Sequence, residues 1–404
     1  MRDLTEHHPD AGRWPEVFAV FLRLGLTSFG GPIAHLGYFR DAFVARRRWL
    51  SEAAYAELVA LCQFLPGPAS SQVGFAIGLL RAGPAGALAA WLAFTLPSAI
   101  LMTAFAYGAG AMKGPLALGL LHGLKLVAVA VVAQAVFGMA RSLTPDARRA
   151  GLALAAIVLV TAVSAALGQV GAIALGAVGG LVLCRSDETA PPDVLAGAVP
   201  PWAGVAALGL FLVLLVAGPI AASATGEPAI AHFSAFYRSG ALVFGGGHVV
   251  LPLLNEAVVK PGWVDPNAFL AGYGAAQAAP GPLFTFAAYL GAVMRPPPNG
   301  IAGALLGLVG IFLPGLLALL AALPFWGRLR TRPAAQAAMR GANAAVVGIL
   351  ASALYNPVWT SAVIDRGDFA AVVAGFVLLT AFRSPPILVV VLGAGLGLAR
   401  AALG

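Results

Sequence analysis

Long apolar stretches dominate this 404-residue sequence. Residues 85–112 and 116–136 are two of them, and about 20 apolar residues are enough to cross a bilayer as a helix. Hydrophobic residues make up 60% of the chain and charged residues only 10%, whereas a soluble domain has about 25% charged residues. The 50 Gly and 29 Pro fit membrane helices, because neighbouring helices bond the backbone groups that such residues leave unpaired. The sequence therefore predicts an all-α polytopic membrane protein.

Charge and cysteine content argue against several other classes of protein. The net charge of +8 comes from short basic clusters between apolar stretches, such as residues 46–48, which suit membrane topology better than a nucleic-acid surface. Cys62 and Cys184 lack any metal or disulfide spacing and are expected to be buried thiols. We therefore expect no nucleic-acid partner, no metal site and no cofactor. Residues 1–10 are polar, so no cleavable signal peptide is expected.

The sequence contains no motif of a serine hydrolase elbow, a zinc protease or a phosphate-binding loop. We therefore expect a transporter in the lipid bilayer rather than an enzyme. Because no nucleotide site is apparent, its energy should come from an ion gradient or from the membrane potential.

The chain divides into two halves joined by a charged, Pro-rich connector. About thirteen apolar segments are apparent, six in each half and one between them. The expected boundaries are a cytoplasmic tail at 1–14, a first repeat at 15–184, a linker with one membrane segment at 185–228, and a second repeat at 229–404. A slight excess of basic residues on the N-terminal side favours a cytoplasmic N-terminus, in a bacterial inner membrane.

The two halves are related in sequence. Phe21, Arg23, Gly25, Phe29, Gly30 and Gly31 recur in the same order and spacing as Phe236, Arg238, Gly240, Phe244, Gly245 and Gly246. Gln63-Phe-Leu-Pro66-Gly67-Pro68 recurs as Gln277-Ala-Ala-Pro280-Gly281-Pro282. Six segments plus one linking segment turn the second copy upside down, so the pattern predicts two inverted repeats, as in many secondary transporters.

Both copies contain the same two interruptions, one at Gly30-Gly31 or Gly245-Gly246 and one at the Pro-Gly-Pro sequence. Each could be a simple kink or a surface loop, but its repetition favours a functional break. Pro is favoured as the first residue of a helix, so Pro68 and Pro282 are expected to start half-helices within the membrane. The free N–H groups of a helix start form an anion site, to which Ser70, Ser71 and Gln72 would add side chains. The second copy has Leu283-Phe284-Thr285 instead, so we expect the first copy to hold more of the ligand.

Charged residues near these breaks are candidates for binding and coupling. Arg23 and Arg238 each precede the Gly-Gly break within an apolar run, and a guanidinium fork suits a tetrahedral oxyanion. Snorkelling to the interface or a structural ion pair is the competing interpretation. His35 and His248 flank the first break as interior or proton-carrying residues. Asp41 and Glu256 occupy matched positions and could be surface groups or a proton-coupling pair.

Two motifs, repeated in order, carry a resemblance to a known family. They are Phe29-Gly30-Gly31-Pro32-Ile33-Ala34-His35 and Gln63-Phe64-Leu65-Pro66-Gly67-Pro68-Ala69-Ser70-Ser71-Gln72, with their copies at 243–248 and 279–282. In these motifs the chain resembles the chromate ion transporter family in its long, two-domain bacterial form, over about residues 15–400. The resemblance implies export of chromate, an oxyanion similar to sulfate, and resistance to chromate. The second copy departs from the pattern, because Gly247 stands where the first copy has Pro32.

Three other functions stay open from the sequence. The chain could carry sulfate or another oxyanion, perform enzymatic chemistry on a lipid phosphate within the membrane, or form a channel. Direction, coupling to protons and oligomeric state are also open, with a homodimer as one option. Our hypothesis is a potential-driven oxyanion exporter whose substrate meets Arg23, Arg238 and both Pro-Gly-Pro breaks in one central cavity.

Overall fold

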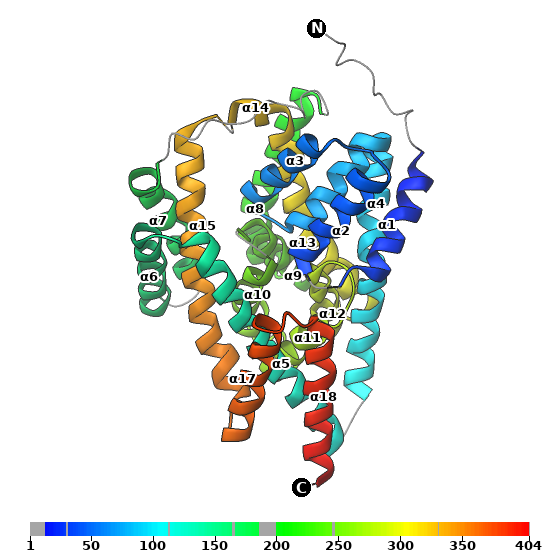
Figure 1. Cartoon of the computed structure of the whole chain (residues 1–404), viewed down its shortest axis with the longest axis vertical. Coiled ribbons are helices and arrows are strands. Elements are labelled where there is room, and N and C mark those ends of the chain that lie inside the picture. The colour runs from blue at the N-terminus through cyan, green and yellow to red at the C-terminus, as the bar shows by residue number, and fades with distance from the viewer. Residues whose placement is uncertain are drawn as a thin grey trace.

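A computed structural model describes residues 13–29, 31–111, 114–163, 166–185, 199–244, 247–329 and 331–403. Every regular element within these residues is a helix (Figure 1). Six helical segments are long and apolar enough to cross a membrane, and they are 69–108, 115–143, 201–225, 300–328, 333–362 and 386–403. The expected all-α polytopic membrane fold is therefore confirmed. Residues 1–12 of the tail predicted at 1–14, and residues 186–198 of the charged connector, lie outside the described residues.

The helices of the first half begin close to the first expected repeat boundary. In chain order they are α1 Trp14–Thr27, α2 Gly31–Arg40, the π-helical turn η1 Asp41–Arg46, α3 Glu52–Phe64, α4 Ala69–Ala111, α5 Pro115–Leu143, α6 Ala147–Ala162 and α7 Ala166–Leu183.

The second half repeats this order after α8 Pro201–Thr225. Its helices are α9 Pro228–Ala241, η2 Gly247–Val249, α10 Val250–Leu254, the π-helical turn η3 Asn255–Val259, α11 Pro266–Ala276, η4 Leu283–Thr285, α12 Phe286–Val293, α13 Gly300–Ala322, η5 Leu323–Phe325, α14 Trp326–Leu329, α15 Pro333–Ala353, η6 Leu354–Trp359, α16 Thr360–Ala362, α17 Arg366–Thr380 and α18 Pro386–Leu403.

The segment that follows each Pro-Gly-Pro turn is a helical hairpin. In α4 the backbone leaves helical geometry at Ala82 and Gly83, so a half-helix starting at Ala69 turns back into a long helix. The arms touch at Gly78 and Gly86, where a Cβ on either residue would overlap the other's carbonyl. In the second repeat α12 and α13 form the matching hairpin, with Gly291 against Gly303. An α-helix therefore begins directly after Pro68, and the 3₁₀ turn that leads into α12 begins directly after Pro282. That both starts lie within the membrane stays a prediction.

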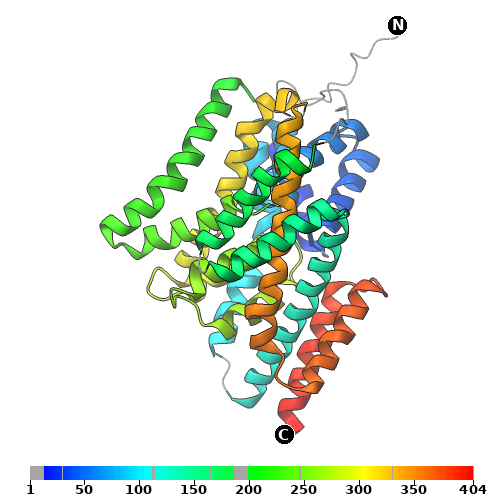
Figure 2. The ribbon, with the colours of Figure 1, turned by 90° about the vertical axis from the view of Figure 1, so that its left-hand side faces the viewer.

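The last two helices of each repeat pack against the other repeat. On one flank α6 and α7 lie beside α15, and near the C-terminus α17 and α18 lie beside α5 (Figures 1 and 2). A Cβ at Gly341 of α15 would overlap Gly176 of α7, and a Cβ at Gly123 of α5 would overlap Gly393 of α18. Small residues permit such close helix approach in membranes. The two repeats are thus interlocked by reciprocal exchange of their terminal hairpins.

The helix α8 connects the two repeats along the periphery of the molecule. Only 6% of its span-length window is buried, which leaves its apolar side chains facing outward. Figure 1 shows α1 starting near the upper end, and Figure 2 shows α8 running downward from that end before α9 begins. This path agrees with an inverted second repeat, and the orientation of each repeat in a membrane stays a prediction.

Candidate functional site

The two Pro-Gly-Pro turns form matched contacts with the other repeat. The Gly67 N–H donates to the Val243 carbonyl oxygen across 2.7 Å, and the Gly281 N–H donates to the Ser28 carbonyl oxygen across 2.9 Å. Val243 and Ser28 lie at corresponding places before the Gly-Gly breaks of the two repeats. Each Pro-Gly-Pro turn is therefore bonded to the segment that precedes the Gly-Gly sequence of the other repeat.

Only glycine fits at the centre of these turns. The φ angles of Gly67 and Gly281 are 118° and 88°, in a region that side chains with a Cβ rarely adopt. A Cβ on Gly67 would lie 2.7 Å from the Gly315 Cα, and one on Gly281 would lie 2.9 Å from Ser98 Oγ. Gly315 and Ser98 follow the matched prolines of α13 and α4, so each turn rests on the proline-containing helix of the opposite repeat.

The polar residues after Pro68 are occupied largely by internal contacts. The Gln72 side-chain amide donates to the Pro66 carbonyl at 2.9 Å and to the Gly315 carbonyl at 2.8 Å, which clamps the turn against α13. Ser70 and Ser71 are also buried, and Ser71 Oγ has no hydrogen-bond partner among the described residues. Gln63 is exposed at the end of α3. This turn is a packed joint in which polar side chains hold the backbone.

His35 links the segment before the first break to the start of α4 within its own repeat. Its Nε2 lies 3.2 Å from the Ser28 carbonyl oxygen, and its Nδ1 lies 3.4 Å from Ser70 Oγ. A carbonyl only accepts, so Nε2 carries the hydrogen and the neutral ring accepts at Nδ1 from Ser70. The same Ser28 carbonyl accepts from Gly281. The buried His35 ring therefore supports the contact between the repeats.

A cavity of about 440 Å³ opens beside the second Pro-Gly-Pro turn. It is lined by both repeats, and the lining residues are Phe29, Gly31, Ala34, Tyr38, Val131, Gln134, His248, Ala276, Gln277, Ala279, Gly281, Leu283, Leu379, Arg383, Ser384, Pro385 and Pro386. We call it the break cavity. It contains the start of α2, whose first-turn N–H groups have no partner within the helix, and it contains no carboxylate among its described lining residues.

Arg383 supplies the positive charge of the break cavity. It lies in the turn between α17 and α18, which Figure 1 shows at mid-height, level with α11 and α12. Its φ is 52°, a left-handed conformation that costs a non-glycine residue roughly 1–3 kcal/mol. Arg48 is the other non-glycine residue with positive φ in the described part of the chain. Such strain persists where the surroundings demand that residue, and it is concentrated at functional sites.

Two amides and a histidine complete the polar lining. Gln277 lines the cavity, and its Nε2 group is buried with no acceptor within hydrogen-bond distance among the described residues. Gln134 enters from the middle of α5. His248 Nδ1 lies 2.7 Å from the Tyr273 hydroxyl, which fixes the ring at the cavity wall. A guanidinium, amide N–H groups and a helix start together form a set of donors suited to an anion.

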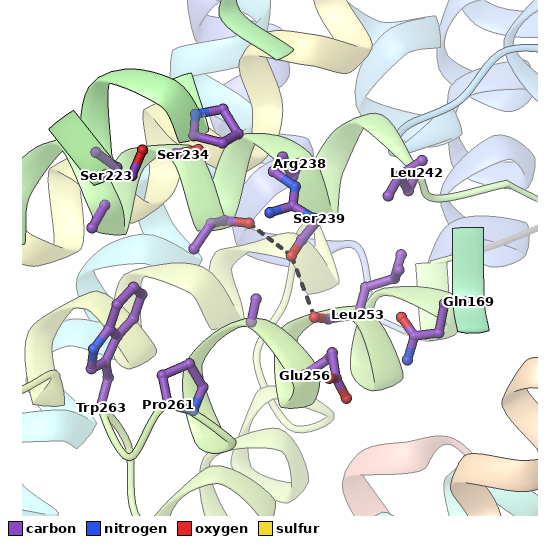
Figure 3. A pocket seen from close by; sticks show the side chains of 15 residues that line it. Gln169, Ser223, Ser234, Arg238, Ser239, Leu242, Leu253, Glu256, Pro261 and Trp263 are labelled. Carbon is purple, nitrogen blue, oxygen red and sulfur yellow. Dashed lines mark hydrogen bonds between the residues drawn. The ribbon is translucent and has the colours of Figure 1, made fainter. Parts of the chain in front are cut away.

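Arg238 faces a second cavity of about 410 Å³, shown in Figure 3. Arg238 and Ser239 of α9 lie opposite Glu256 of η3, and Gln169 reaches the cavity from α7 of the first repeat. Ser239 Oγ donates to the Ala235 carbonyl at 2.9 Å. Arg238 itself is half-buried at the wall of this cavity.

The structure does not bring the two candidate arginines together. Arg23 is an exposed residue of α1, and it lines neither the break cavity nor the Arg238 cavity. The expectation that Arg23, Arg238 and both half-helix starts surround one cavity therefore finds no geometric support. Gly31, His248, Gln277 and Gly281 do share a cavity. Gly30, Gly245 and Gly246 lie outside the described residues, and Pro280 and Pro282 are buried within the second turn.

The two candidate coupling carboxylates lie in matched π-helical turns. Asp41 of η1 pairs with Arg46 at 2.8 Å and is largely exposed, whereas Glu256 of η3 pairs with Lys260 at 2.6 Å and is only 13% exposed. Helical turns of this type are frequent at functional sites. Glu256 is the better placed of the two for coupling, because it faces Arg238 across a cavity (Figure 3).

Sequence reasoning missed Arg383 and Gln134 as site residues. Arg383 precedes Pro385-Pro386 between two apolar segments, a pattern that is also typical of a surface loop with a topology charge. Gln134 is a single polar residue in the apolar run of α5, and this isolation is the signal that could have identified it.

Comparisons with known proteins give a consistent result. The family model for the chromate transporter matches residues 15–183 and again residues 230–398. The chromate transport protein of Pseudomonas aeruginosa is 29% identical to this chain, over 97% of this chain and 93% of its own length. The chromate transport protein of Cupriavidus metallidurans is 26% identical over 83% and 80%. An uncharacterized transporter of Methanocaldococcus jannaschii is 25% identical over 78% and 77%. No solved structure matches the chain.

Proposed function

Because the chain belongs to the chromate transporter family, we propose that it exports chromate through the break cavity. The observation that carries this proposal is a cavity at which the Gly-Gly break of the first repeat meets the Pro-Gly-Pro turn of the second, beside Arg383 and Gln277. Transporter sites are commonly built at such discontinuous helices between repeats. The membrane is proposed to be the bacterial inner membrane, with a cytoplasmic N-terminus.

The donor set of the break cavity suits a tetrahedral oxyanion. A guanidinium presents a planar fork of N–H groups that remains charged at all relevant pH values, and Arg383 is the arginine of this cavity. The Gln277 N–H group and the start of α2 add neutral donors. Because the described lining residues include no carboxylate, no negative charge of these residues repels a dianion at the site. Sulfate has the same shape and charge, so it is the expected competitor.

The membrane potential is the proposed driving force. Chromate carries two negative charges near neutral pH, and a cytoplasm at negative potential expels it. Each charge gains about 2.3 kcal/mol per 100 mV. Two charges therefore gain roughly 4.6 kcal/mol, which corresponds to more than a thousandfold gradient. One resident cation beside a dianion leaves the complex negative, so the potential also acts on the loaded site.

Proton coupling is a second contribution, for which Glu256 is the proposed carrier. Glu256 is shielded from solvent and lies in the Arg238 cavity, close enough to Lys260 to form an ion pair. If Glu256 bound a proton and released Lys260 during transport, the pH gradient would add to the driving force. The Arg238 cavity would then serve as a coupling site, separate from the oxyanion site.

Chromate flux into inside-out vesicles tests the function. An inside-positive potential, imposed with potassium and valinomycin at equal pH, should load chromate into vesicles that contain the protein. External sulfate should slow this uptake. Uptake that follows only the pH gradient would contradict potential-driven export and leave electroneutral proton exchange. No chromate uptake under either condition would contradict the proposed substrate.

A further inference from the structure

A third cavity, of about 630 Å³, lies where α6, α7 and α15 meet. Its lining residues are Asp146, Ala147, Arg148, Arg149, Leu183, Cys184, Arg185 and Arg340. We call it the basic corner. It gathers four arginines and one carboxylate among its described residues. It is distinct from the break cavity, with which it shares no residue.

The end of α7 holds three of these arginines in place. Arg148 donates to the Leu183 carbonyl at 3.4 Å, Arg185 to the Leu181 carbonyl at 2.8 Å, and Arg340 to the Cys184 carbonyl at 2.9 Å. These carbonyls belong to the end of the helix, where they have no N–H partners within the helix and carry partial negative charge. A guanidinium has five N–H donors, so one such bond leaves Arg148 and Arg185 with further donors for an anion.

Asp146, the carboxylate of the described lining, pairs with Arg149. Asp146 caps α6 by accepting from the Arg149 backbone N–H at 3.0 Å, and it pairs with the Arg149 guanidinium at 2.6 Å. These two bonds hold the pKa of the Asp146 carboxyl below its ordinary value, so the pair is charged at neutral pH. The described lining of the cavity contains no second carboxylate to balance Arg148 and Arg185.

The matched corner of the other repeat shows what the basic corner lacks. There Asp365 caps α17 as Asp146 caps α6, and three residues after the cap stands Asp368. Asp368 is buried, accepts from His122 at 3.0 Å and pairs with Arg400. The Asp368 carboxylate therefore lies between the His122 imidazole of α5 and the Arg400 guanidinium of α18.

In the basic corner the corresponding places carry cations. Arg149 stands three residues after its cap, where the other corner has Asp368. Arg340 precedes Gly341 of α15 as His122 precedes Gly123 of α5, and these glycines make the matched helix contacts. The matched positions are thus held by Asp368 and His122 in one corner and by Arg149 and Arg340 in the basic corner.

We propose that the basic corner binds a phosphate-class oxyanion, presented as the headgroup of an anionic lipid. Its oxygens would take the role that the Asp368 carboxylate has in the matched corner. Apolar side chains on α6 and α7 continue from the cavity along the outer flank, with Leu154, Val178 and Val182 at least 62% exposed. That surface suits acyl chains below a headgroup, whereas a free oxyanion would make no use of it. Basic pockets between membrane helices are suited to anionic lipid headgroups.

Lipid retention in native mass spectrometry is the test. The protein would be purified in detergent, supplied with phosphatidylglycerol, and compared with the double variant Arg148→Gln/Arg185→Gln. Arg366→Gln is the matched control, because Arg366 is an exposed arginine that directly follows the Asp365 cap of the other corner. Each lost arginine removes charge-assisted hydrogen bonds to the headgroup, so each should weaken binding at least about tenfold.

Wild type and Arg366→Gln should retain the lipid, and the double variant should lose it. Equal retention by all three proteins would overturn the proposal. The variant Arg148→Lys/Arg185→Lys keeps the charge and should recover part of the binding, which separates lost recognition from misfolding. Inorganic phosphate is the second probe, and it should bind far more weakly than the lipid. If phosphate bound as tightly, a free oxyanion would be the occupant and the assignment to a lipid would be wrong.

Acidic residues of the connector are the alternative partners for these arginines. Asp187, Glu188 and Asp193 follow Arg185 in the sequence and lie outside the described residues. In the variant Asp187→Asn/Glu188→Gln/Asp193→Asn, lipid binding should match that of wild type. If phosphatidylglycerol bound only to this variant, the connector would be the native partner and the proposal would be wrong.

Discussion

The Pro-Gly-Pro turns of the two repeats form the same backbone contact in different surroundings. Gly67 and Gly281 each donate to a carbonyl before the opposite Gly-Gly break, at 2.7 and 2.9 Å. Around Gly67, the Gln72 amide closes the joint onto α13. Gly281, in contrast, lines the break cavity. The Gln277 amide N–H group beside it has no hydrogen-bond partner among the described residues.

This difference indicates how a duplicated fold can make one site. The frame needs both copies, because each break is held by the other repeat. Polarity at the turn does not by itself identify a site: Ser70, Ser71 and Gln72 make the first turn rich in polar groups, and Gln72 uses its N–H donors on backbone carbonyls. The second turn is followed by Leu283 and Phe284, which are apolar. The charge of its cavity comes from Arg383, in the turn between α17 and α18.

The largest expected effect comes from filling the glycine of either turn. Gly67→Ala combines a φ of 118° with a Cβ placed 2.7 Å from the Gly315 Cα, so we expect a loss of about 3 kcal/mol or more in stability. Gly83→Ala is the control, because Gly83 also has positive φ, 61°, but open space around its Cβ position. Thermal unfolding in detergent compares them, and equal losses would mean that close packing of the turn adds nothing.

The amides of the two turns should separate stability from transport. Gln72→Ala removes two bonds to backbone carbonyls, and leaving them unpaired in the interior should destabilise the protein by about 2 kcal/mol. Gln277→Ala removes a donor for which the described residues offer no acceptor, so stability should change by less than about 0.5 kcal/mol while chromate uptake falls. Unfolding and vesicle uptake measured on both variants check this, and the reverse assignment would refute the distinction between a closed and an open turn.

An effect of similar size is expected at His35. His35→Ala breaks the bond to the Ser28 carbonyl and leaves Ser70 without its ring acceptor, which should cost about 1–3 kcal/mol. His35→Asn keeps one donor and one acceptor and should restore part of the loss. If instead His35→Ala unfolded like wild type and lost transport alone, the ring would act on the substrate.

The smallest effects are expected at the two arginines of the apolar runs, Arg238 and Arg23. Arg238 is half-buried in a polar cavity, whereas Arg23 is exposed on α1. Arg238→Ala should lower chromate uptake several-fold, and Arg23→Ala should leave uptake and stability near wild type. A complete loss of uptake in Arg23→Ala, with normal insertion, would restore Arg23 as an essential residue.

Much of the fold was predictable because Gly and Pro act locally on the backbone. Gly67 and Pro68 determine a turn and a helix start wherever they occur, so both breaks and their duplication could be recognised in the sequence. The exchange of terminal hairpins could not, because contacts such as that between Gly176 and Gly341 join small residues far apart in the chain. Hydropathy treats these glycines as any others.

The candidate site was predictable only in part for the same reason. Gly31, Gly281 and Gln277 were expected near the substrate, and these three line one cavity. The Pro-Gly-Pro turn of the first repeat is not among its lining residues. Arg383 enters this cavity because the turn between α17 and α18 lies beside residues of α2 and α5 in the first repeat, a placement that no local pattern encodes. The arginines within apolar runs were the stronger sequence signal, yet α1 directs Arg23 outward.

The most direct test of the break cavity is the variant Arg383→Gly, measured for stability and for flux. Glycine adopts a φ of 52° without strain, so unfolding should occur at the wild-type temperature or up to a few degrees above it. Potential-driven chromate uptake into inside-out vesicles should nevertheless fall at least about a hundredfold, as expected for loss of a charge-assisted contact of about 3 kcal/mol. Wild-type uptake by a stable Arg383→Gly protein would contradict the claim that chromate crosses through this cavity.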